Sequence, residues 1–206
     1  PAARTRLADA WLTAGLRTGD AGMFRSAVTL TGPLLAADRP SLEALFVHAT
    51  ASHHLGDYDG AARAWRAALA QRDEPGFANN LAYVLLVRGD RADLDEARRL
   101  AERAYAAVPT DAGVVATVGL LRSRQGDRQA AIARYREALK LEPDSVESML
   151  GLAEVLAAEP EQARAAASRA EARDWLDKAR AKLQGPGHRL PELKKQLDAV
   201  TASVAG

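Results

Sequence analysis

Four glycines recur along this chain at a nearly constant interval. Gly22, Gly56, Gly89 and Gly126 are separated by 34, 33 and 37 residues. Each is followed by a segment with the apolar spacing of a helix, and a glycine at a break between helices can adopt a positive φ at no steric cost. A period of this length predicts stacked helix–turn–helix units rather than one large core.

A second series of residues keeps nearly the same period in the helix that follows each glycine. Its members are Ala27, Ala61, Ala97 and Ala131, then Thr31, Trp65, Ala101 and Tyr135 four residues later, then Leu34, Ala68, Ala104 and Ala138 three residues after those. Only 5% of the residues are aromatic although 48% are hydrophobic, so alanine carries much of the apolar surface. Small side chains at fixed places predict helices that pack closely.

The most regular copy spans residues 112–143, AGVVATVGLLRSRQGDRQAAIARYREALKLEP. Its first helix carries Val115, Val118 and Gly119, its second carries Ala131 and Tyr135, and a proline ends it. This order of large, small and aromatic residues resembles the tetratricopeptide repeat. The resemblance covers roughly residues 8–183. It implies an all-α, right-handed α-solenoid that forms a single superhelical domain.

About five helix pairs fit this pattern, followed by a capping helix. We place the pairs at about 8–41, 42–74, 75–111, 112–145 and 146–184, and the capping helix at about 190–204. Gly32-Pro33 interrupts the second helix of the first pair, which predicts a kink or two short helices there. The segment Arg91–Asp95 inserts three residues into the third pair, and Ser41 is a candidate helix cap.

The last copy departs from the repeat. Glu159-Pro160 replaces the Gly-Asp turn, and Pro160 suits the first position of a new helix. That helix is expected to run to about Leu183, where Gly185-Pro186-Gly187 ends it. The final amphipathic helix, from Pro191, would then cover the exposed end of the stack.

Composition excludes several classes of site. The absence of cysteine rules out disulfide frameworks, thiolate metal sites and cysteine nucleophiles. The 28 basic and 27 acidic side chains nearly balance, which argues against a nucleic-acid partner. No apolar run approaches the roughly 18 residues of a membrane span, so no membrane insertion is expected. The richness in arginine and alanine is typical of a bacterial protein, for which both the cytoplasm and the periplasm stay open.

No motif for catalysis, a cofactor or a metal is present. The chain lacks G-x-S-x-G, a Walker loop and a dinucleotide fingerprint. The spacings among His48, His53 and His54 are five, six and one residues, whereas two metal ligands on one helical face stand four apart. We therefore expect no enzyme activity, no cofactor and no metal.

In the tetratricopeptide repeat family, the first helix of each pair lines a concave groove that binds peptides or helices of partner proteins. The resemblance implies such a groove here, with the partner-binding residues Phe46, Thr50, Asn79, Asn80, Tyr83, Leu86, Leu120 and Arg124. One subset of the family grips the C-terminal carboxylate of heat-shock chaperones with Lys, Arg and Asn. Only Asn80 fits that set. The other places are held by Phe46, Thr50, Gly113 and Thr117. We expect a groove for a hydrophobic or amphipathic segment rather than for a chaperone tail.

Each candidate also has a structural interpretation. Phe46 and Tyr83 are either aromatic anchors or packing residues, because groove and interhelix positions differ by one helical step. Asn79 either hydrogen-bonds a bound backbone or braces a neighbouring helix. Trp65 is expected to pack. The fourth copy carries five arginines: Arg122, Arg124, Arg128, Arg134 and Arg136. They either form a solvated face or bind an acidic partner, and Arg124 is the best candidate for such a contact.

The sequence therefore predicts a non-catalytic module that binds a peptide or helix of a partner protein. Two alternatives stay open. The first is a self-associating scaffold, a homo-oligomer held by the long helix after Pro160. The second is an accessory or regulatory domain of a larger enzyme or secretion complex.

Overall fold

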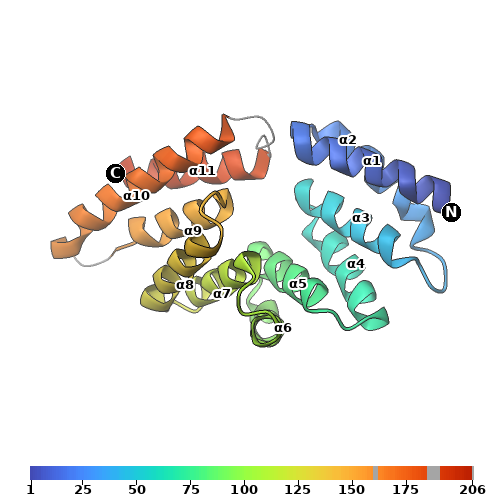
Figure 1. Cartoon of the computed structure of the whole chain (residues 1–206), viewed down its shortest axis with the longest axis horizontal. Helices are drawn as coiled ribbons and strands as arrows, with labels where there is room; N and C mark the ends of the chain where they lie inside the picture. Colours follow the sequence, from blue (N-terminus) through green and yellow to red (C-terminus); the bar gives the residue numbers. More distant parts are fainter. Residues whose placement is uncertain (160–161, 185–190, 206) are drawn as a thin grey trace. The chain divides into compact units, whose positions relative to one another are not determined.

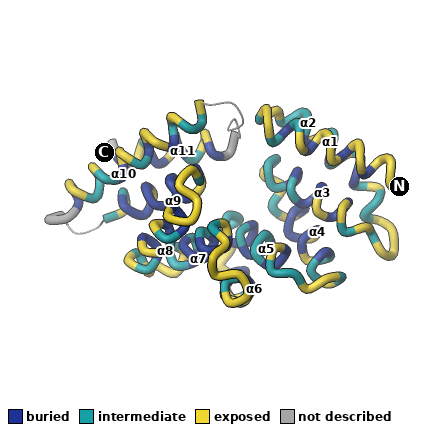
Figure 2. The backbone as a smooth tube through the Cα atoms, in the orientation of Figure 1, coloured by how far each residue is buried: buried dark blue, intermediate teal, exposed yellow. Residues whose placement is uncertain are grey.

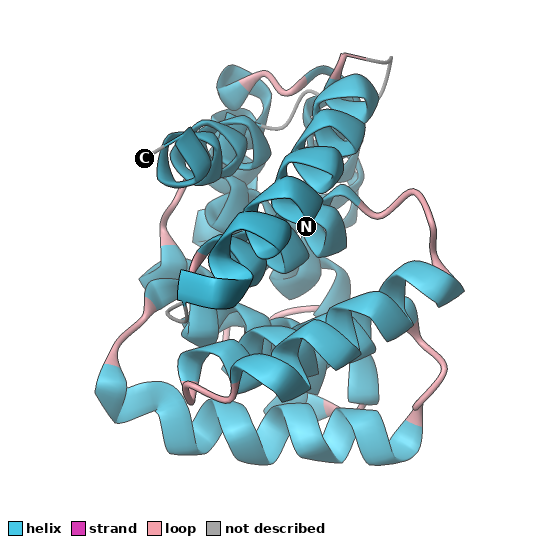
Figure 3. Cartoon of the chain, turned by 90° about the vertical axis from the view of Figure 1, so that its left-hand side faces the viewer, coloured by secondary structure: helices cyan, strands magenta, loops and turns pink. Residues whose placement is uncertain are grey.

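The structure is a computed structural model that describes residues 1–159, 162–184 and 191–205. Every regular element in these residues is a helix (Figure 3). The α-helices are α1 (Ala2–Thr18), α2 (Ala21–Thr31), α3 (Leu42–His54), α4 (Tyr58–Gln71), α5 (Pro75–Arg88), α6 (Leu94–Ala107), α7 (Ala112–Arg124), α8 (Arg128–Leu141), α9 (Val146–Ala157), α10 (Gln162–Leu183) and α11 (Pro191–Ala205), and the 3-10 helices are η1 (Gly32–Leu34) and η2 (Arg91–Asp93). In the part of the chain so described, no helix combines the length and apolar character that crossing a membrane requires.

The helices form five successive pairs and a final helix, which confirms the predicted all-α solenoid. The chain divides into two compact units, Pro1–Ala104 and Tyr105–Gly206. In the first unit, each helix from α1 to α5 packs against the next one along the chain (Figure 1). In the second unit, α7, α8, α9 and α10 do the same, and α11 packs against α9 and α10. The single superhelical domain stays a prediction.

The Gly-Asp turns join the two helices of a pair. Gly56, Gly89 and Gly126 have φ values of 77°, 77° and 80°, as predicted for glycines at these breaks. The aspartate after each glycine then caps the next helix; Asp57 Oδ1, for example, accepts a hydrogen bond from the Gly60 N–H at 2.8 Å. In the second and fourth pairs one dipeptide therefore ends the first helix and caps the second, whereas Asp90 caps η2, which precedes α6.

The first copy uses a different glycine from the one that we predicted. Gly19, with φ of 71°, ends α1, and its N–H donates to the Gly15 carbonyl at 2.7 Å. Gly22 lies inside the first turn of α2, where its N–H donates to Asp20 Oδ1 at 2.7 Å. The prediction for Gly22 was wrong because it followed the repeat spacing, whereas the helix end decides where a positive φ is needed.

The periodic alanines form the core between helices. Ala27, Ala61, Ala97 and Ala131 are all fully buried. Trp65 and Tyr135 fill larger places in the same series and are 3% and 4% exposed, which confirms Trp65 as a packing residue. Figure 2 shows this burial on one side of most helices and along almost all of α9.

Several local predictions can be compared with the structure. The interruption at Gly32-Pro33 is confirmed, because α2 ends at Thr31 and η1 follows. Ser41 caps α3 by accepting a hydrogen bond from the Ala44 N–H at 3.2 Å. The predicted start at Pro160 and the predicted end at Gly185-Pro186-Gly187 lie outside the described residues.

Candidate partner-binding face

Residues of α3 and α5 form one face in the first unit, which we name the α3–α5 face: Phe46, Thr50, His53, Asn79 and Tyr83. Phe46, Thr50 and His53 are spaced by four and three residues on α3, so they share one side of that helix. The ring centroids of His53 and Tyr83 lie 5.4 Å apart, so Tyr83 of α5 contacts this side of α3. Asn79 lies one helical turn before Tyr83 on α5.

Phe46 is an exposed ring on a buried aromatic base. Phe46 is 42% exposed, and its ring meets the Trp65 ring edge-on at a centroid distance of 5.5 Å. The Trp65 ring lies 5.8 Å from the Phe77 ring of α5, and Phe77 is 8% exposed. Phe46 therefore packs on Trp65 and keeps part of its ring exposed, and its role as an anchor stays a prediction.

The histidines of α3 take part in packing. His54 stacks on Phe24 of α2 at 4.8 Å, and His53 meets the rings of His54 at 5.2 Å and Tyr58 at 5.7 Å. His48 Nδ1 lies 2.9 Å from the Thr31 hydroxyl, and burial lowers the pKa of His48. Within the described ranges, no three His, Cys, Asp or Glu side chains come close enough to hold a metal ion.

Asn79 carries an acceptor that the described structure does not use. Its Oδ1 atom is buried and accepts no hydrogen bond from any described residue, although the residue as a whole is only half-buried. A buried polar atom without a partner costs about 1–3 kcal/mol. Asn80, the residue next to it, is also half-buried. A partner would reach this buried oxygen only after neighbouring side chains moved.

The other predicted partner-binding residues lie in three different environments. Leu86 is 2% exposed, so a partner would reach it only after neighbouring side chains moved. Leu120, in the second unit, is partly buried against the core cluster of that unit. Arg124 is exposed at the end of α7. Thr117 stands at one of the positions where some members of the family bind a C-terminal carboxylate; it is buried and donates to the Gly113 carbonyl at 3.0 Å.

Three of the five arginines of the fourth copy are engaged inside the second unit. Arg128 lies 2.6 Å from Glu159 and donates to the Val155 carbonyl at 3.0 Å. Arg134 donates to Tyr105 Oη at 2.8 Å and to Glu137 at 2.6 Å, and Arg136 contacts Glu171 at 2.7 Å. These three guanidinium groups contact residues outside their own helical turn within the second unit, so they do not form a purely solvated face.

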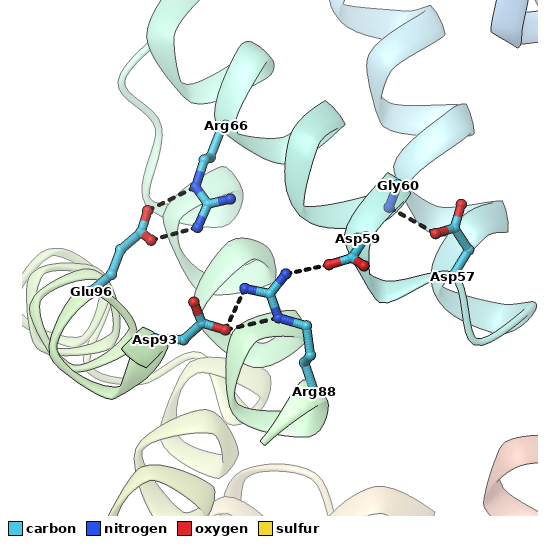
Figure 4. Close-up of polar contacts among 7 residues, drawn as sticks. All are labelled: Asp57, Asp59, Gly60, Arg66, Arg88, Asp93 and Glu96. Carbon is cyan, nitrogen blue, oxygen red and sulfur yellow. Dashed lines mark hydrogen bonds and ion pairs between the residues drawn. The ribbon is translucent and has the colours of Figure 1, made fainter. Parts of the chain in front are cut away.

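Acidic and basic side chains of the first unit join successive helices (Figure 4). Arg66 of α4 makes a two-fold contact with Glu96 of α6, with its Nε 3.0 Å from Oε1, and this hydrogen bond lowers the pKa of Glu96. Arg88 at the end of α5 donates to Asp59 and to Asp93, and Asp93 is 9% exposed. Asp93 belongs to the insertion in the third pair, so these residues form part of the packed structure as η2.

The sequence places His53 on the same side of its helix as Phe46, because residues seven apart share a helical face, although His53 is not among the predicted partner-binding residues. The contact with Tyr83 depends on how α3 and α5 pack, which the spacing within one helix does not give.

Comparisons with known proteins agree with this architecture. The profile of the tetratricopeptide repeat matches residues 54–112 and 119–185. TTC0263, a tetratricopeptide-repeat protein of Thermus thermophilus, superposes with a TM-score of 0.67 at 22% identity over 95% of this chain and 99% of that one. MamA of Desulfovibrio magneticus RS-1, from residue 41 to its end, superposes with a TM-score of 0.61 at 18% identity over 86% of this chain and 96% of that one.

A sequence relative is known over a shorter stretch. The probable biofilm formation methyltransferase WspC of Pseudomonas putida is 39% identical over 71 residues, which are 34% of this chain and 17% of that protein. The two solved structures show the shared fold, and the profile covers more than half of the residues. This chain belongs to the tetratricopeptide repeat family, whose fold serves protein interactions.

Proposed function

We propose that this chain is a non-catalytic interaction module whose α3–α5 face binds a peptide or helix of a partner protein. The observation that carries the proposal is an exposed aromatic ring on a buried aromatic base, Phe46 on Trp65. Asn79 of α5 adds a buried amide oxygen that has no hydrogen-bond partner among the described residues. Rigid aromatic anchors supply large contact area at a small entropic cost. An asparagine amide can pair with a peptide N–H or C=O group. The combination suits an extended or helical peptide with an apolar side chain.

The residues of the second unit enter the proposal separately. Arg124 is exposed, and a guanidinium group favours a carboxylate of the partner. Leu120 would add apolar contact where it is not covered by the core. We assign both to partner contacts of the second unit, and the substitution Arg124→Glu tests them independently of the α3–α5 face.

The test uses peptides selected from a random display library on the full chain. Fluorescence anisotropy then measures the affinity of a selected peptide for the unmodified chain, Phe46→Ala and Asn79→Ala. Each substitution should weaken binding at least tenfold, which corresponds to about 1.4 kcal/mol. Leu141→Ala is the matched control, because Leu141 is 44% exposed and apolar but lies on α8. Equal affinities for all four proteins would contradict the α3–α5 face.

A second candidate is an accessory domain within a larger protein. The likeness to WspC favours it, since the matched stretch is a small part of a protein named as a methyltransferase. In such a protein, the repeats would position a catalytic domain on its protein substrate. The natural open reading frame decides this candidate: a methyltransferase domain encoded in the same frame supports it, and a frame that contains only helical repeats rejects it.

A further inference from the structure

A carboxylate borders the α3–α5 face. Glu43 lies in the first turn of α3, three residues before Phe46. Residues three apart are neighbours on the surface of a helix, so the carboxylate stands beside the aromatic ring. Both side chains are exposed. A partner that contacts Phe46 therefore meets the negative charge of Glu43 at the same place.

The ring of Phe46 has a face that Trp65 does not cover. The two rings lie at 85° to each other with their centroids 5.5 Å apart, so an edge of one ring meets the face of the other. Such a contact leaves at least one face of the Phe46 ring free of Trp65. The face of an aromatic ring carries negative charge and attracts cations. Among the described residues, three cationic side chains lie over aromatic rings, and none of them lies over Phe46.

The carboxylate of Glu43 has no cationic partner in the described part of the chain. The nearest basic residue in the sequence is Arg39, which forms no ion pair with it there. A negative charge in the first turn does stabilise a helix through the helix dipole, so Glu43 also has a structural reason to be present. Any test of a binding role must therefore separate it from this structural role.

An arginine of the second unit shows how a ring and a glutamate hold a guanidinium group together. Arg134 lies over the ring of Tyr105, 5.0 Å from its centroid, and its Nη1 atom lies 2.6 Å from Glu137 Oε2. Both contacts form at once because the guanidinium group is planar. Its face stacks on the ring, while the N–H groups in its plane point toward the carboxylate.

The same arrangement occurs in the first unit, beside the α3–α5 face. Arg72 lies 5.6 Å from the ring centroid of Phe77, and its Nε atom lies 2.6 Å from Glu74 Oε1. Phe77 is the ring on the other side of Trp65 from Phe46. This chain thus fills two pairs of an aromatic ring and a glutamate with an arginine. Phe46 with Glu43 is a further pair of this kind, and it lacks the arginine.

We propose that Phe46 and Glu43 bind an arginine side chain of the partner segment. The guanidinium group lies over the open face of the Phe46 ring and donates hydrogen bonds to the Glu43 carboxylate. The methylene stem of the same side chain adds apolar contact with the ring. This inference rests on the proposed function, because it names the chemistry of the partner that the α3–α5 face takes: an extended or helical segment that carries an arginine.

The chain offers a matched control for Glu43. Glu147 of α9 is exposed and lies in the first turn after a serine cap, Ser145. Glu43 follows the cap Ser41 on α3 in the same way. Leu150 stands three residues after Glu147 and is fully buried, so no exposed ring accompanies this carboxylate. The substitution Glu147→Gln therefore removes the same charge from the same place in a helix, without an aromatic neighbour at that spacing.

The test starts from peptides that a random display library yields on the full chain and whose binding Phe46→Ala weakens. Each arginine of such a peptide is replaced in turn by citrulline, which has nearly the same shape but no charge. Fluorescence anisotropy measures the affinity of both forms for the unmodified chain, Glu43→Gln, Phe46→Leu and Glu147→Gln. Thermal melts check that each variant folds.

One arginine of the peptide should prove specific for this pair. Its citrulline form should bind the unmodified chain at least about fivefold more weakly, because the contact with the ring and the charged hydrogen bond are both weakened. On Glu43→Gln and on Phe46→Leu, the two forms should differ by less than about twofold. On Glu147→Gln, the full difference should remain. Glu43→Gln carries the test alone if Phe46→Leu does not fold.

Two results overturn the arginine contact and leave the α3–α5 face in place. In the first, peptides that need Phe46 carry no arginine or bind equally well as citrulline forms. In the second, the citrulline form loses as much affinity on Glu43→Gln as on the unmodified chain. A different result rejects both proposals: Phe46→Ala weakens the binding of none of the selected peptides.

Discussion

The ring of Tyr135 occupies the space that a side chain at Gly151 would need. A Cβ atom added to Gly151 would lie 2.6 Å from Tyr135 Cε1 and 2.7 Å from its Oη. A Cβ atom added to Gly119 would lie 3.1 Å from Tyr135 Cδ1. Tyr135 of α8 therefore packs against α7 and α9 at two positions that have no side chain. The two glycines set how closely these three helices approach.

The substitution Gly151→Ala should destabilise the protein by about 1–3 kcal/mol, because the added methyl group overlaps the Tyr135 ring. Helix propensity alone predicts the opposite sign, since alanine is favoured over glycine by about 1 kcal/mol within a helix. Denaturant unfolding measures the change. Gly76→Ala is the control, because no atom lies within 4 Å of a Cβ added there, and it should be neutral or stabilising. Equal effects of the two substitutions would contradict the close contact.

Sequence reasoning reached the fold because the same packing contact is repeated. The buried positions of Ala61 and Tyr135 follow from the repeat period, since each copy packs its two helices through the same positions. The exception at Gly22 was local, because the first copy ends its first helix at Gly19. Repetition predicts the packing positions better than it predicts the ends of a degenerate copy.

The candidate site was less accessible to sequence reasoning. Glu96 of α6 pairs with Arg66 of α4, which lies 30 residues earlier in the chain. Contacts of this kind depend on how one pair stacks on the next. Leu86 was predicted to line the groove but is buried, because groove and core positions on α5 differ by only one helical step.

Arg88 should contribute more to stability than other arginines of the first unit. The substitution Arg88→Met leaves Asp93, whose side chain is 12% exposed, without its cationic partner. We expect a loss of about 1–3 kcal/mol in the free energy of unfolding. The control is Arg98→Met, since Arg98 is 44% exposed and lies 3.7 Å from both Asp95 and Glu102. Exposed pairs of this kind contribute about 0–1 kcal/mol, so a similar loss in both variants would contradict the role of Arg88.

Stability should fall in mild acid because of His48. Burial lowers its pKa below the value of 6.5 that applies in the unfolded chain, so the unfolded chain binds the proton more tightly. The contribution of neutral His48 is therefore present above pH 6.5 and is lost as the pH falls toward the lower pKa of the folded state. The melting temperature, measured between pH 7.5 and 5, should decrease less in His48→Gln than in the unmodified chain. A parallel decrease in both would assign the acid sensitivity to other groups.

Helix α11 should be an integral part of the second unit. Leu197 is 5% exposed and belongs to the core cluster that includes Leu152 of α9 and Leu176 of α10. Leu197→Ala should cost about 2–4 kcal/mol, as for other large-to-small changes in a core. Lys195→Ala, at an exposed position of the same helix, should change stability by less than about 0.5 kcal/mol. Trp175 packs against the same cluster, so its fluorescence reports whether the second unit loosens. If both substitutions had the same small effect, α11 would not share this core, and the second unit would need another closing element.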